Sequence, residues 1–211
     1  DWSMKLVLLI AVPAAVGLIV LAEPLVATMV YGGVFSADDV EMTALALQAF
    51  AVGLVGFSFV KILAPAYFAR EDTRTPVRIG LIALAVNFVL SVSLAWYLTS
   101  IGYAGTHAGL ALAISVAALL NAALLYRGLL SNGVLRHSPG WGALLLQVLV
   151  AIVLMWLAID RLERPLSWWL DATVMDRVGW LAVSIAAGAG VYFIVLLALG
   201  LRPAKLGIRP H

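Results

Sequence analysis

The stretch Pro76–Leu98 reads PVRIGLIALAVNFVLSVSLAWYL, and it decides the fold class. Arg78 is its only charged residue. A helix crosses a bilayer with about 20 mostly apolar residues, so this stretch is long enough to span one. A barrel strand would alternate apolar and polar side chains, but here apolar residues fall on every face. The stretch therefore predicts a transmembrane helix and an all-α fold.

The composition of the whole chain agrees with this prediction. Of 211 residues, 64% are hydrophobic and 11% are charged, and the net charge is +2. Soluble domains carry about 45–50% apolar and about 25% charged residues, so an ordinary soluble domain is excluded. The chain has no cysteine, which excludes disulfide frameworks and thiolate metal sites.

Apolar runs of spanning length recur along the chain, separated by clusters of charge. They predict a polytopic transmembrane helix bundle of six spans: Lys5–Ala22, Thr43–Ala69, Pro76–Leu98, Thr106–Arg127, Gly142–Ile159 and Val178–Leu201.

Basic residues are distributed unequally between the two sides of these spans. If the N-terminus is cytoplasmic, that side holds Lys5, Arg70, Arg74, Arg78, Arg127, Arg136, Arg202, Lys205 and Arg209. The opposite side holds Arg161, Arg164 and Arg177. Because Lys and Arg are retained on the cytoplasmic side, we expect both termini to be cytoplasmic.

Glu23 follows the first span. It lies 18 residues after Lys5, about 27 Å along a helix, which places it at the far membrane interface. Pro24 cannot donate to a helical carbonyl, so a bend is expected there. The residues expected to lie along the interface after it are Leu25, Val26, Met29 and Val30. A solvated carboxylate at a kinked helix end and a proton-coupling role both remain open.

Lys61 is a cation inside the second span. Pro65, four residues on, removes the helical partner of the Lys61 carbonyl and favours a kink. Arg70 would mark the interface about 13 Å away. Ionisable residues inside a membrane are candidates for transport pathways, although a lysine can also snorkel to the interface or form a structural ion pair.

The loop after this span is the densest cluster of charge in the chain. It reads AREDTRTPV over residues 69–77. Thr75 is predicted to be the N-cap of the next helix and Pro76 its first residue. A solvated cytoplasmic turn is the simplest interpretation of the loop.

Asn87 and Asn121 are amides within spans, and each must hydrogen-bond to another helix or to water. Small residues also recur at helical spacing: Gly105, Gly109, Ala113 and Ala117, then Ser184 with Gly188, and Ala186 with Gly190. Both features predict helix packing, with substrate contact as the alternative.

The sequence contains no recognisable set of catalytic residues. The histidines His107, His137 and His211 are scattered over different loops, and no acid–base set, phosphate-binding loop or zinc spacing is present. We therefore expect a protein that is not an enzyme, with no metal, no cofactor and no nucleic-acid partner.

Several strings carry a resemblance to a known family. They are LAEPL at 21–25, YGGVFSADD at 31–39, KILAPAYFAREDTRTPV at 61–77, AGLALA at 108–113 and LNAALLY at 120–126. Together they resemble the MurJ/MviN family of bacterial lipid II flippases, over nearly the whole chain. Weaker versions of the string at 61–77 occur in related polysaccharide exporters.

The resemblance implies a transporter of fourteen helices that moves a lipid-linked peptidoglycan precursor across the bacterial inner membrane by alternating access. This chain would be its last six helices and would pack against the missing N-terminal helices and membrane lipids. Residues 1–131 would be four helices of the C-terminal lobe, and residues 132–211 an extra pair that forms a groove for the lipid tail. The family's main cationic residues lie mostly outside this part.

The resemblance also implies roles for individual residues. Lys61 and Pro65 would form a secondary contact or gating element, and Glu23 would belong to the same substrate pathway. Gly188 and Gly190 would give the groove room. The residues of the cytoplasmic gate or hinge would be Arg70, Asp72, Arg74 and Thr75.

Three alternatives remain beside a lipid II flippase. They are a flippase for lipid-linked O-antigen or capsule oligosaccharides, a membrane scaffold or helper without transport, and a membrane enzyme acting on polyprenyl substrates. The chain begins at Asp1 without a methionine, so we expect a fragment that is unstable alone because packing faces are left unpaired.

Overall fold

The computed structural model describes residues 2–32, 35–103, 105–135 and 140–201. Apart from one isolated bridge between Gly32 and Phe35, the regular elements in these ranges are helices. They are α1 (Trp2–Val20), α2 (Ala22–Val30), α3 (Ala37–Phe68), α4 (Arg74–Ser100), α5 (Thr106–Ser131), α6 (Trp141–Leu162), α7 (Leu166–Asp171) and α8 (Val174–Ala198).

Six of these helices are long and apolar enough to cross a membrane: α1, α3, α4, α5, α6 and α8. Each contains most of one predicted span, so the all-α fold and the number of spans are confirmed for the described residues. The short helices α2 and α7 were not predicted as separate elements, because runs of nine and six residues carry too little periodicity to stand out.

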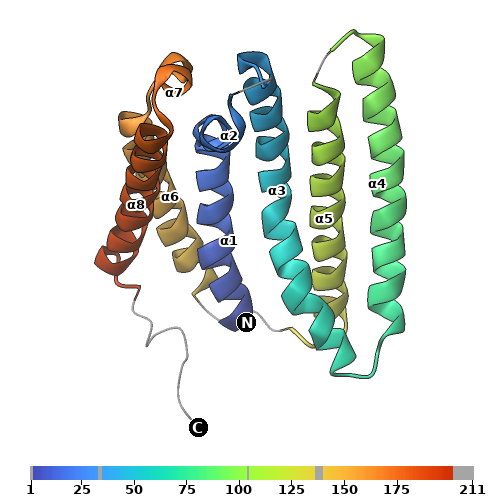
Figure 1. Cartoon of the computed structure of the whole chain (residues 1–211). Coiled ribbons are helices and arrows are strands. Elements are labelled where there is room, and N and C mark those ends of the chain that lie inside the picture. The colour runs from blue at the N-terminus through green and yellow to red at the C-terminus, as the bar shows by residue number, and fades with distance from the viewer. Residues whose placement is uncertain (1, 33–34, 104, 136–139, 202–211) are drawn as a thin grey trace.

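The spanning helices form a row. Contacts link α8 to α6, α6 to α1, α1 to α3, α3 to α5 and α5 to α4, and Figure 1 shows them side by side in that order. One end of the row, here called the turn end, carries the start of α1, the α3–α4 turn and the end of α8. The opposite end, here called the cap end, carries α2 and α7.

The contact between α3 and α5 is the closest in the row. A Cβ added to Gly53 would lie 2.7 Å from the Ser115 Cα, and one added to Gly56 would lie 2.7 Å from the Ala118 carbonyl carbon. The Ser115 hydroxyl donates to the Ala49 carbonyl oxygen at 2.6 Å. We call this contact the α3–α5 seam, and it brings two backbones together through small residues.

The helix α1 joins the two sides of the row. The Tyr192 hydroxyl of α8 donates to the Leu9 carbonyl oxygen at 2.8 Å, and the Gln48 amide of α3 donates to the Ile19 carbonyl oxygen at 3.1 Å. Apolar residues of α1, α6 and α8 form one buried cluster around Ala151 and Met155. The helix α1 is therefore shared between both halves of the molecule.

The bend after α1 occurs at Leu21, not at Pro24 as predicted. Leu21 has φ −93° and ψ 14°, and α2 starts at the next residue and turns across the end of α1 (Figure 1). Pro24 sits in the first turn of α2, where its missing N–H costs nothing, and it leaves the Val20 carbonyl without a helical donor. The bend therefore lies three residues before the proline that causes it.

The prediction for the side chains that follow is correct in part. Met29 and Val30 are exposed, at 81% and 48%. Val26 was expected at the interface but is buried, because α2 packs this face against the cluster that contains Val40, Ala44 and Trp169.

Candidate functional site

Lys61 lies on an exposed face of α3, seven residues before the end of the helix. Within the described residues it makes no hydrogen bond or ion pair. Pro65, also exposed, lies inside the same unbroken helix and cannot donate to the Lys61 carbonyl. A free ammonium and a backbone acceptor without its helical donor therefore occur at one residue.

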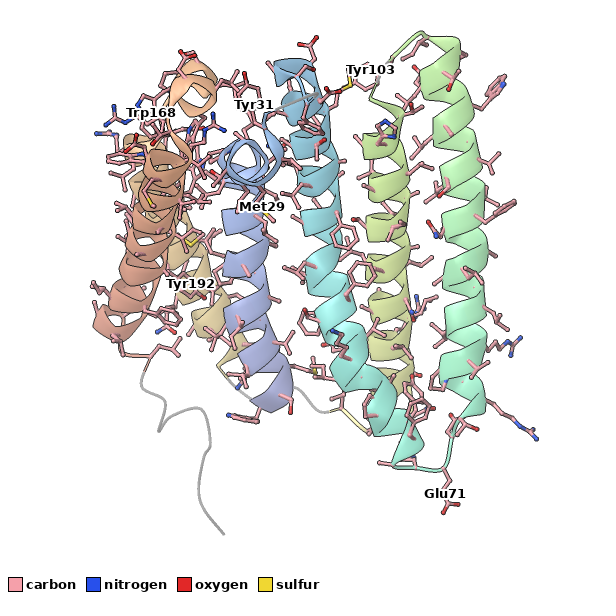
Figure 2. All side chains as sticks on the ribbon, in the orientation of Figure 1. Met29, Tyr31, Glu71, Tyr103, Trp168 and Tyr192 are labelled. Atoms are coloured by element: carbon pink, nitrogen blue, oxygen red, sulfur yellow. The ribbon has the colours of Figure 1, made fainter. Side chains whose placement is uncertain are left out.

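The α3–α4 turn is closed by the backbone. The Asp72 N–H donates to the Tyr67 carbonyl oxygen at 3.1 Å, and the Glu71 N–H donates to the Phe68 carbonyl oxygen at 3.0 Å. These two bonds form a Schellman motif, whose left-handed position is usually glycine. Here that position is Glu71, with φ 60°, and Figure 2 shows it at the tip of the turn.

The predicted N-cap at Thr75 is wrong. Helix α4 begins at Arg74, with Thr73 as its flanking residue, and Thr75 is already helical. The Asp72 carboxylate accepts a hydrogen bond from the Thr75 N–H at 3.0 Å. An N-cap side chain makes the same bond to an N–H of the first helical turn. That bond from Thr75, followed by the Arg74 backbone and the Arg70 charge, holds the pKa of Asp72 below its ordinary value.

Glu23 lies at the cap end, in the first turn of α2. It is near Glu163 at the end of α6, whose pKa is raised by burial first and by the charges of Asp160 and Glu23 second. The chain thus brings three carboxylates together at the cap end. Glu23 is separated from Lys61 and the α3–α4 turn, which belong to the other end of the row.

The two intramembrane amides have different surroundings. Asn87 accepts the Ser91 hydroxyl at 3.3 Å, so the partner that the described residues give it lies on its own helix. The Oδ1 of Asn121 is buried without a hydrogen-bond partner among the described residues. Neighbouring α5 residues Gly109 and Ala113 are buried, and Gly109 packs against Leu98 of α4.

An apolar groove of about 340 Å³ runs between α1, α6 and α8. Gly188 lines it together with residues such as Gly17, Met155 and Ala189. A Cβ on Gly188 would lie 2.8 Å from the Ile159 Cδ1, so this glycine also lets α6 and α8 pack. Gly190 does not line the groove, and a Cβ there would meet nothing within 4 Å.

The structure therefore groups the candidate residues into three places. Arg70, Asp72, Arg74 and Thr75 share the α3–α4 turn, with Lys61 and Pro65 in the two helical turns before it. Gly188 is in the groove, and Glu23 is at the cap end.

Sequence reasoning missed two features. The first is the pair Gly53 and Gly56, whose three-residue spacing on the second span was a usable signal for the α3–α5 seam. The second is Arg177, which was counted as a loop cation but is 6% exposed within α8. Two of its partners, Ala27 and Tyr31, lie about 150 residues away in the chain, so no local pattern reveals its burial.

Comparison with known proteins identifies the family of the chain. Residues 1–200 match the family model described as lipid II flippase MurJ. The chain is 38% identical to a probable lipid II flippase MurJ of Vibrio cholerae, covering 96% of this chain and 37% of that protein. It is 38% identical to a probable lipid II flippase MurJ of Haemophilus influenzae, covering 98% and 39%.

A third relative, the lipid II flippase MurJ of Burkholderia cenocepacia, is 36% identical over 97% of this chain and 38% of its own length. The chain thus spans less than two fifths of the length of these relatives. It is a multi-pass membrane protein with six candidate spans in its described part, and the chain belongs to the MurJ lipid II flippase family.

Proposed function

We propose that this chain is the C-terminal six-span part of a lipid II flippase. The complete protein moves an undecaprenyl-pyrophosphate-linked peptidoglycan precursor across the bacterial inner membrane by alternating access. The observation that carries the proposal is the family match over residues 1–200, together with three relatives at 36–38% identity that bear this name.

Lys61 and Pro65 supply a contact for the anionic head group. The Lys61 ammonium is exposed on α3, and the described residues offer it no carboxylate. A cation without a partner inside a membrane attracts a phosphate where water lines the site. The Lys61 carbonyl, which Pro65 leaves without its helical donor, accepts hydrogen bonds, so it suits a hydroxyl or N–H of the head group and not its phosphate.

The groove holds the hydrocarbon tail. It is lined by apolar side chains of α1, α6 and α8, and Gly188 is among them. Residues 132–211 form the extra pair that makes one wall of this groove, and residues 1–131 are four helices of the C-terminal lobe.

The turn end is the cytoplasmic side. Five of the basic residues counted there lie in described segments at that end: Lys5, Arg70, Arg74, Arg78 and Arg127. Four others, Arg136, Arg202, Lys205 and Arg209, lie outside the described residues. On this orientation both termini are cytoplasmic, and the hydrogen-bonded turn at Arg70–Thr75 is the cytoplasmic hinge between α3 and α4.

The test replaces Lys61 in the complete protein, reconstituted in phospholipid vesicles that contain lipid II. Lys61→Ala is expected to lower the initial rate of lipid II translocation several-fold, and Lys61→Arg to preserve it because the charge remains. The control is Arg127→Ala, which removes an exposed cation from α5. Wild-type transport by Lys61→Ala would make the role of Lys61 structural.

The substrate class is tested in the same vesicles. The complete protein is expected to translocate lipid II and to leave a polyprenyl-linked O-antigen unit in its original leaflet. The reverse result would favour the oligosaccharide flippase. Failure to move either lipid, in vesicles where the protein is folded, would favour the scaffold.

A further inference from the structure

Arg177 is the most deeply buried cation among the described residues, and neither the head-group contact nor the groove uses it. It occupies the first turn of α8, and 6% of its surface is exposed. No carboxylate forms an ion pair with it in the described part of the chain. Burying a charge without a counter-charge is strongly unfavourable unless other groups replace its hydration.

Backbone carbonyls of the two short helices α2 and α7 replace the hydration of the Arg177 guanidinium. The guanidinium donates to the Ala27 carbonyl oxygen at 3.2 Å and to the Leu170 carbonyl oxygen at 2.7 Å. It also lies 5.0 Å from the centre of the Tyr31 ring, a geometry suited to a cation–π contact. Nε is buried without a partner among the described residues.

Both carbonyls lie in the last turn of their helix. Ala27 is in α2, which ends at Val30, and Leu170 is in α7, which ends at Asp171. Carbonyls at this position have no helical donor, and the helix dipole places partial negative charge there. The Arg177 guanidinium therefore donates hydrogen bonds to the negative C-terminal ends of both helices.

These two helices are too short to be stable alone. They have nine and six residues, and isolated helices below about 12–15 residues are marginal in water. Helix α2 follows α1 in the chain, and helix α7 precedes α8, so each short helix adjoins a long one. In Figure 2, Tyr31 of the α2 side and Trp168 of α7 both lie at the cap end.

We propose that Arg177 is a positioning residue that fixes the cap end of α8 against α2 and so sets the width of the groove. The α8 residues that line the groove, Ile185 to Phe193, begin two helical turns after Arg177. At the cap end, Arg177 links the α1–α2 wall to the α7–α8 wall. The proposal concerns geometry and does not depend on which lipid the protein moves.

The experiment measures this geometry in the complete protein with pairs of spin labels. Residues 1–211 contain no cysteine, so any cysteines elsewhere are replaced and pairs are introduced here. Met29→Cys with Met175→Cys reports the cap end, since both residues are about four-fifths exposed, at 81% and 80%. Ser3→Cys with Leu197→Cys, at exposed positions of α1 and α8, reports the turn end.

Arg177→Met is expected to shift the cap-end distance distribution to longer values and to broaden it, while the turn-end distribution stays unchanged. Arg177→Lys is expected to give a smaller shift, because an ammonium is a point donor and cannot match the planar fork that serves both carbonyls. The matched control is Arg161→Met, which removes an exposed cation at the same end and should change neither distribution.

Two results would overturn the proposal. One is a cap-end distribution in Arg177→Met equal to that of the parent protein. The other is an equal change at both ends, which would mean a general requirement for folding. If Arg177→Met yields no folded protein, Tyr31→Leu and Arg177→Lys test the proposal instead. The cap-end distance distribution must broaden in both variants. An unchanged distribution in either variant contradicts the proposal.

Discussion

Small residues line both the α3–α5 seam and the groove, but the helices pack closely at the seam and leave space at the groove. In the seam, Gly53 and Gly56 face backbone atoms of α5 at distances that leave no room for a Cβ. In the groove, Gly188 faces the flexible tip of Ile159, and about 340 Å³ stays open beside it. The same residue type closes one contact and helps to leave space in the other.

The difference lies in what the opposite helix presents. Ser115 and Ala118 are themselves small, so α5 can approach α3 until backbones touch. Around the groove, Met155, Ile159 and Tyr192 have long side chains, which keep the α1 backbone away from α6 and α8. A stripe of small residues therefore predicts close packing only when a second stripe faces it.

The largest expected effect comes from filling the seam. Gly56→Leu should lower the free energy of unfolding by about 3 kcal/mol, because its Cβ would meet the Ala118 and Leu119 backbones, which cannot move aside. Thermal unfolding of the purified complete protein measures the change. The control is Gly80→Leu on α4, where a Cβ meets nothing within 4 Å. Equal melting temperatures for the two variants would contradict the account of the seam.

Filling the groove should change transport without changing stability. Ala189 lines the groove and is exposed, so Ala189→Trp is expected to occupy its volume and lower lipid II translocation several-fold at an unchanged melting temperature. Ala186→Trp, on the same helix but outside the groove, is the control. Normal transport by Ala189→Trp would remove the groove from the lipid pathway.

A smaller effect, a gain in stability, is expected at the turn end of α3. Glu71 has φ 60°, a conformation that costs a residue with a Cβ about 1–2 kcal/mol. Glu71→Gly should therefore raise the free energy of unfolding by about 1 kcal/mol after the entropy cost of glycine is subtracted. Glu71→Ala keeps the Cβ and should give no such gain, so equal stability of the two variants would rule out backbone strain.

The smallest effect is a pH dependence at the cap end of α6, beside the groove. Burial, then Asp160 and Glu23, raise the pKa of Glu163 above 4.5. The folded protein therefore binds more protons than the unfolded chain just above pH 4.5, and stability falls as pH rises through that range. Glu163→Gln should flatten the plot of melting temperature against pH in this range.

The sequence predicts the six spans correctly but does not predict how the helices begin and bend at their ends. Apolar runs predict six helices because a helix that crosses lipid must be apolar along its whole length, as in Pro76–Leu98. The N-cap at Thr75 failed because Asp72, three residues earlier, offers a stronger acceptor at the same turn. The proline in the sequence predicts a bend at Pro24 itself, whereas the hydrogen bond that it removes belongs to the turn before it.

Candidate residues divide in the same way. Lys61 and Pro65 could be singled out because their effects are local to one helix. Arg177 could not, since its partners Ala27 and Tyr31 lie about 150 residues away in the chain. The groove was expected from resemblance, but its lining by α1 depends on tertiary packing that no local pattern contains.

The order of helices in the row also bears on synthesis. Helix α1 packs against α6, yet 120 residues, 21 to 140, separate the end of one from the start of the other. At about 5–20 residues per second, a ribosome takes roughly 6–24 seconds to make that interval. During this time the α6-facing side of α1 has not met its partner. The polar contacts of Tyr192 and Arg177 form later still, so the groove can assemble only after α8 has been made.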